Sequence, residues 1–164
     1  MKKNIIYTII ACAFILFPCR SYGQDYMTVT FDMAKALITG GDAAIGKNVR
    51  QVRQENELSI ACFKIDGDTA VYGGSESGDG YQFVDTYIFV KGVCVERFVM
   101  YDDVEGGWIK DAFDTASDLV QAAGLNPVIT ANRCRFKYRE CKVDMMVECK
   151  GRQFILYVTY TADH

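Results

Sequence analysis

The chain has 164 residues, of which 50% are hydrophobic, 24% are charged and 13% are aromatic. This composition is typical of a globular domain and excludes a disordered chain, a collagen-like chain and a polar low-complexity tail. The length suits one domain with a sizeable hydrophobic core.

The N-terminus has the pattern of an export signal. Lys2 and Lys3 precede an apolar run over Ile5–Phe17, which has the length of a signal-peptide core and is shorter than the ~20 residues that a membrane span needs. Small residues follow the run and favour cleavage after Gly23. The sequence therefore predicts a signal peptide over residues 1–23.

We accordingly expect one domain over 24–164 in a protein that is periplasmic or secreted. An uncleaved membrane anchor and a lipid anchor at Cys12 or Cys19 are the alternatives. Loss of the leader removes three basic residues, which leaves 15 basic against 21 acidic residues and a net charge of −6. This charge argues against nucleic-acid binding, and it leaves the leader as the only predicted contact with a membrane.

Cysteine and histidine usage argues against metal sites, cofactors and imidazole-based catalysis. Only one histidine is present, at the C-terminus, and no Cys-x-x-Cys motif occurs. We expect zero to two disulfide bridges, and their pairing stays open. The cysteines that follow the leader are Cys62, Cys94, Cys134, Cys141 and Cys149.

The N-terminal half of the domain begins with helical patterns. A helix is predicted from an N-cap at Thr30 to Gly40–Gly41, and a second one over Asp42–Asn56, although Gly46 weakens it. A β-prone run over 58–65 follows.

The chain then turns at Gly67–Asp68 and begins a short strand over Ala70–Tyr72. The glycine-rich segment Gly73–Gly80 is interpreted as a flexible loop. It lacks the motif and the following helix that a phosphate-binding loop needs.

The clearest pattern is a hairpin of Phe83–Val90 and Val93–Tyr101 around Lys91–Gly92. A two-residue turn there would place Val90 opposite Val93, Ile88 opposite Val95 and Val84 opposite Val99. Both faces of this hairpin are apolar, so we expect it at the centre of a sheet or covered on both sides.

A helix over 108–123 shows one apolar stripe at helical spacing, and Gly124 and Pro127 end it. The last third is β-prone. There a Lys150–Gly151 turn would set Val147 opposite Phe154 and Met145 opposite Leu156. The predicted fold is therefore an α+β two-layer sandwich, in which one long amphipathic helix and N-terminal helical segments cover an antiparallel sheet.

The most distinctive polar feature is a basic strip of Arg133, Arg135, Lys137 and Arg139, whose alternate spacing places its members on one face of a strand. One interpretation is a binding surface for an acidic protein or a polyanionic glycan. The other is a solvated edge strand, on which cations block unwanted pairing.

An acidic cluster of Asp102, Asp103 and Glu105 lies just before the helix, close to Trp108. Carboxylates beside an aromatic side chain are what a glycosidase uses. Acids at this position are, however, ordinarily explained by helix capping and the helix dipole. No residue is therefore predicted to be catalytic.

The sequence favours an exported, non-catalytic interaction or ligand-binding protein. The alternatives are a small carboxylate-based hydrolase and a structural component of envelope assembly. The ligand and the oligomeric state stay open at this point.

In layout the chain resembles the small exported proteins of unknown function that are abundant in Bacteroidetes. The features that carry the resemblance are the leader that ends before Gln24, the hairpin with Tyr87–Cys94, the helix after it and the closing strand with Phe154–Tyr157. The resemblance implies export and no activity. A looser similarity, carried by Asp42–Asn56 and the strands after it, is to the helix-helix-sheet units of outer-membrane assembly lipoproteins and β-lactamase-inhibitor-like domains.

Overall fold

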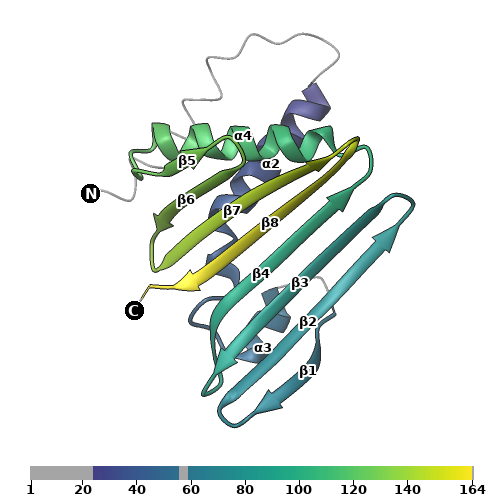
Figure 1. Ribbon diagram of the computed structural model, residues 1–164. Helices are drawn as coiled ribbons and strands as arrows, with labels where there is room; N and C mark the ends of the chain where they lie inside the picture. The colour runs from purple at the N-terminus through teal and green to yellow at the C-terminus, as the bar shows by residue number, and fades with distance from the viewer. Residues whose placement is uncertain (1–23, 56–58, 164) are drawn as a thin grey trace.

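The computed structural model describes residues 24–55 and 59–163 and shows helices packed on one face of an eight-stranded antiparallel sheet (Figure 1). The helices are α2 (Gln24–Thr39), the short 3₁₀ helix η1 (Gly40–Ala43), α3 (Val49–Glu55) and α4 (Gly107–Ala122). The strands are β1 (Ala61–Asp66), β2 (Thr69–Gly78), β3 (Tyr81–Val90), β4 (Val93–Asp103), β5 (Val128–Thr130), β6 (Arg133–Tyr138), β7 (Cys141–Lys150) and β8 (Gln153–Ala162). The predicted α+β two-layer sandwich is confirmed.

The sheet consists of two four-stranded meanders that meet through their last strands. The strand order is β1-β2-β3-β4-β8-β7-β6-β5, so β4 pairs with β8. In each half of the sheet the strands follow one another in chain order from the edge to this central pair. Helix α2 precedes the first meander and α4 precedes the second. The apolar hairpin of β3 and β4 thus lies in the interior of the sheet, as its two apolar faces predicted.

Two hydrophobic clusters lie between the sheet and the helices. The larger joins α2 and α4 to β4, β6, β7 and β8, with Leu37, Phe113 and Leu156 at most 1% exposed. The smaller places Val52 of α3 against Tyr87 and Phe89 of β3. Burial of these side chains is what holds the helices on one face of the sheet.

Two of the predicted helices differ in extent from those observed. Helix α2 begins at Gln24, so Thr30 lies inside it and is buried instead of capping it. The second predicted helix is reduced to η1 and α3, because Gly46 adopts a left-handed φ of 81° between them. Helices α2 and α4 have 16 residues each, so two helices of equal length, with the shorter α3 beside them, cover the sheet in place of one long helix.

The prediction of a loop over Gly73–Gly80 is wrong for most of that segment. Strand β2 runs through Gly78 and pairs with β3 from Thr69↔Val90 to Gly78↔Tyr81. The glycines fit this strand because other groups take the space of a side chain. A Cβ on Gly73 would lie 2.7 Å from the Phe63 ring. Ladder hydrogen bonds to β3 therefore outweigh the low strand propensity of this segment.

Both predicted hairpins are present, but their registers differ from the prediction. In β3–β4 the pairs Val90↔Val93 and Phe89↔Cys94 are as expected. A bulge then changes the partner of Ile88 from Val95 to Glu96, and that of Val84 from Val99 to Met100.

In β7–β8 the turn is Gly151–Arg152, one residue later than predicted, so Val147 lies opposite Leu156 and Met145 opposite Val158. Gly151 has a φ of 68°, which suits the first position of a two-residue turn. The register shift is two residues, which leaves every side chain on its predicted face.

Candidate interaction surface

The face of the sheet that the helices leave uncovered, here called the open face, faces the viewer in Figure 1. Strand alternation puts onto it every second residue of the central strands, while the residues between them join the hydrophobic clusters. None of the helices in the described residues packs against this face. It is therefore a broad surface on which another molecule can lie flat.

The centre of the open face is apolar. Val84, Met100, Tyr157 and Met146 follow one another across β3, β4, β8 and β7, and all four are half-buried. Phe98 stacks on Tyr157 with ring centroids 6.3 Å apart. Partial burial against neighbours on the same face leaves these side chains ordered but accessible, as an interaction surface requires.

The basic strip borders the open face along β6. Arg133, Arg135 and Lys137 are exposed there, whereas Cys134 and Phe136 between them are buried in the core, which is the predicted alternation. Arg139 does not continue the strip, because it lies in the β6–β7 turn with a φ of 54° and points toward η1.

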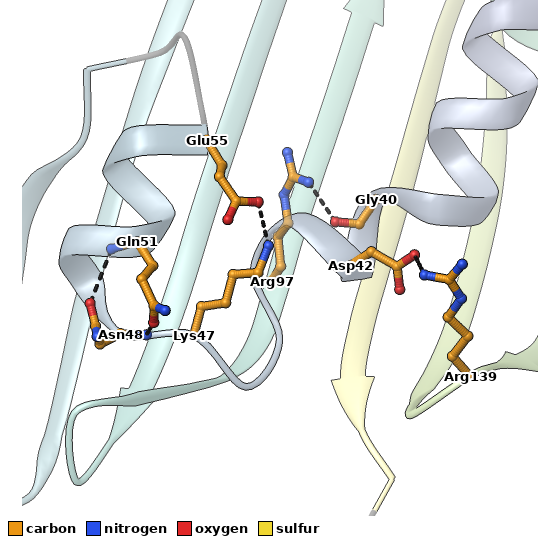
Figure 2. Close-up of polar contacts among 8 residues, drawn as sticks. All are labelled: Gly40, Asp42, Lys47, Asn48, Gln51, Glu55, Arg97 and Arg139. Atoms are coloured by element: carbon orange, nitrogen blue, oxygen red, sulfur yellow. Dashed lines mark hydrogen bonds and ion pairs between the residues drawn. The ribbon is translucent and has the colours of Figure 1, made fainter.

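Most of the strip is already paired within the chain. The Arg133 guanidinium donates to Asp144 with Nε–Oδ1 at 2.8 Å, and Lys137 pairs with Asp163. Arg139 pairs with Asp42, as Figure 2 shows. Arg135 is exposed and has no acidic partner among the described residues. The positive charge that the strip offers to another molecule is therefore concentrated at Arg135.

Asp163 shows the effect of these cations on a carboxylate. Hydrogen bonds from Lys137 and Lys142 lower its pKa from 3.8 to about 2, and the Lys142 Nζ lies 2.9 Å from its Oδ1. Asp163 therefore stays ionised under mildly acidic conditions and neutralises part of the positive charge of the basic strip. A ligand that competes for Lys137 and Lys142 would have to displace this carboxylate.

The acidic cluster is divided between two sides of the sheet. Asp102 lies on the open face, where Gln153 donates to both of its carboxylate oxygens at 2.8 and 3.0 Å. Asp103 turns to the helix side and accepts from the Glu105 backbone N–H at 2.8 Å and from Trp108 Nε1 at 2.9 Å. Asp103 thus fastens the loop before α4 to the first turn of that helix, which is a structural role.

A buried polar cluster on the helix side was not predicted from the sequence. Asp85 is 1% exposed and receives two hydrogen bonds from Arg97, at 3.0 and 2.6 Å, and one from the Tyr87 hydroxyl at 2.5 Å. Arg97 also donates to the Gly40 carbonyl at 2.7 Å, across to the end of α2 (Figure 2). No local pattern identifies this cluster, because its members come together only when β3, β4 and α2 pack.

Burial shifts the titration of several groups around this cluster. Burial works to lower the pKa of Arg97, but the hydrogen bonds and charge of Asp85 outweigh it and the pKa is raised. Burial raises the pKa of the Tyr101 hydroxyl and of the Cys94 thiol to about 12 each, and that of the Cys141 thiol to about 11. These thiols are therefore protonated near neutral pH and are poor nucleophiles.

The cysteines of the described residues are all free. Cys94, Cys134 and Cys141 are buried, while Cys62 and Cys149 are exposed.

A shallow hollow of about 440 Å³ lies at the end of α4, lined by Gln121, Asn126, Pro127 and Ile129. It contains none of the predicted site residues, and within the described residues no group of three or more potential metal ligands occurs.

The predicted leader over 1–23 lies outside the described residues, as does Leu58. Within the part that is described, none of the helices combines the length and the apolar character of a membrane span. Comparisons of the chain with protein-family models, with curated proteins and with solved structures found no match. Arguments about function therefore depend on the chemistry of the surfaces described above.

Proposed function

We propose that this chain is an exported, non-catalytic binding module that holds an acidic protein surface against the open face of its sheet. The observation that supports this proposal most strongly is the apolar centre around Phe98, Met100 and Tyr157, on the face that the described helices leave uncovered. Apolar residues gathered on one exposed face are typical of interaction sites.

The charge around this centre favours an acidic partner. Arg135 and the neighbouring cations of β6 border the open face, whereas Asp111, Asp114 and Asp118 are exposed on α4 in the opposite layer. An acidic protein would therefore be attracted to the open face and repelled from the helices. Export is supported by the basic start and apolar run of the leader.

The proposal can be tested with peptides of defined charge. We would titrate the 15N-labelled protein with an amphipathic peptide of alternating Leu and Glu, with the same peptide carrying Lys for Glu, and with heparin. The Leu–Glu peptide is expected to shift amide signals of β4, β8 and β7 and to bind about tenfold more tightly than the Lys form.

Two variants localise the effect. Tyr157→Ser should weaken binding of the Leu–Glu peptide, and Arg135→Ser should reduce its dependence on salt, while Asp118→Ser on α4 serves as the control. Signal changes confined to the helices, or equal binding of both peptides, would contradict the proposal. Binding of heparin alone would replace the acidic protein with a polyanionic glycan as the partner.

A further inference from the structure

Strand β1 forms one edge of the sheet and presents an unusually open side. It pairs with β2 on one side, and no other strand in the described part of the chain pairs with its outer edge. All six of its residues are exposed, and the large apolar side chains Phe63 and Ile65 are 65% and 70% exposed. An edge strand of this kind is a template for pairing with a further strand.

The turn after β1 shows which backbone groups face outward. The two-residue turn Gly67–Asp68 closes on the pair Asp66↔Thr69, and Lys64↔Val71 follows two residues away. In such a hairpin the closing pair exchanges both backbone hydrogen bonds, so the N–H and C=O groups of Asp66 and Lys64 point to β2. The N–H and C=O of Ile65 therefore point to the free edge.

These directions restrict how a second, antiparallel copy of β1 can pair. Outward groups have to face outward groups, so Ile65 lies opposite Ile65 of the second copy or, two residues along, opposite Phe63, where the bulge already disturbs regular pairing. The first register sets Lys64 opposite Asp66 of the second copy, and does so twice by symmetry. The second register sets Lys64 opposite Lys64, which is repulsive. Charge complementarity therefore selects the register that is centred on Ile65.

We propose that two copies of this chain join edge to edge through β1, antiparallel and centred on Ile65, and form one continuous sheet. Within one chain Lys64 and Asp66 lie on the same face, with Nζ and Oδ2 3.4 Å apart, and both are highly exposed. Each would gain an opposite charge from the second copy. On the other face the two Ile65 side chains would shield each other from water.

The contact is short, because the bulge between Cys62 and Lys64 limits it on one side and the turn at Gly67 on the other. We therefore expect a weak dimer that forms and dissociates with protein concentration. The contact lies at the outer edge of β1 and does not use the apolar centre around Phe98, Met100 and Tyr157, which lies on β4 and β8, the fourth and fifth strands from that edge. Failure of the dimer would therefore leave peptide binding at that centre intact, and failure of peptide binding would leave the dimer intact.

Charge reversal tests the proposal on the full-length chain by sedimentation velocity over a range of concentrations. Lys64→Asp and Asp66→Lys each place like charges opposite each other, so each is expected to raise the dissociation constant about tenfold. The double variant Lys64→Asp with Asp66→Lys restores opposite charges and should dimerise like the natural chain. An equimolar mixture of the two single variants should likewise form heterodimers.

Lys150→Asp is a matched control. Lys150 lies on β7 and pairs with Glu148 two residues away at 3.3 Å, so it reproduces the charge change and the local geometry away from β1. This variant should dimerise normally. A natural chain that stays monomeric, or single variants that associate as strongly as the control, would overturn the proposal.

Disulfide trapping tests the register in a chain whose Cys12, Cys19, Cys62 and Cys149 are replaced by Ser. Ile65→Cys should form a disulfide-linked dimer on mild oxidation, because the two side chains lie directly opposite. Lys64→Cys should not, because its nearest equivalent lies two residues along the second strand. Trapping of Lys64→Cys and not of Ile65→Cys would show that the proposed register is wrong.

Discussion

At the scale of single residues, Arg97 joins more separate parts of the molecule than its place on β4 suggests. Its guanidinium binds Asp85 of β3, donates to the Gly40 carbonyl after α2 and lies over the rings of Tyr87 and Tyr160 at 5.4 and 5.9 Å. A buried charge is tolerated only when it is paired and hydrogen-bonded in this way. Arg97 therefore stabilises one specific arrangement of α2 on the sheet.

We expect Arg97→Met to lower the free energy of unfolding by about 3–5 kcal/mol, because it leaves the Asp85 carboxylate buried without its counter-charge. Urea denaturation followed by circular dichroism measures this loss. Arg133→Met, which breaks an exposed pair with Asp144, should cost no more than about 1 kcal/mol.

A second variant separates the charge from the packing. Arg97→Met combined with Asp85→Asn removes both charges and keeps an acceptor for the Tyr87 hydroxyl, so it should be more stable than Arg97→Met alone. Equal stability of the single and double variants would show that the ion pair does not govern the effect.

At the scale of elements, close packing at glycines determines where helices meet the sheet. Gly40 is the first residue of η1 and directly follows α2. The Tyr160 ring lies over it, and the Tyr160 hydroxyl donates to the Leu37 carbonyl at 2.8 Å. At Gly107, the first residue of α4, a Cβ would meet nothing within 4 Å. The two glycines therefore respond differently to the same substitution.

Gly40→Ala is expected to destabilise the protein by about 1–3 kcal/mol, because the new Cβ would lie 2.7 Å from Tyr160 Cζ and force the ring to move. Gly107→Ala should instead stabilise it by about 0.5 kcal/mol through higher helix propensity. Thermal melting of the two variants beside the natural chain gives the signs. If both variants destabilised the protein, close packing against Tyr160 would not explain the effect of Gly40→Ala.

At the scale of the whole molecule, β4–β8 is the seam between the two meanders. Arg97↔Tyr160 and Val99↔Val158 pair across this seam, and their side chains meet the helices. The outer strands β1 and β5 have few or no buried residues. Local stability should therefore fall from the seam toward the two edges.

Native-state hydrogen exchange is expected to show this gradient. Amides of β4 and β8 should exchange only through global unfolding, and those of β1 and β5 through local opening. The outward-pointing amide of Ile65 should become better protected as protein concentration rises if the β1 dimer forms. A uniform exchange rate across the sheet would contradict the gradient.

The predictions from the sequence succeeded where neighbouring residues carry the signal. The apolar stripe of α4 and the alternation of β6 are local patterns, and the structure confirms both. The bulge after Phe89 and the continuation of β2 through its glycines depend on the partner strand. The basic strip was identified by residue, but its pairing with Asp144, Asp163 and Asp42 was not.

The sequence by itself determined the two-layer class, the helix that begins near Trp108 and the faces of the closing hairpin, because hydrophobic periodicity acts over a few residues. Only the tertiary structure decided that β4 meets β8, that Asp85 and Arg97 form a buried pair, and that the described helices all pack on the same face of the sheet. These features join residues far apart along the chain, and their energies arise from burial and pairing that no local pattern records.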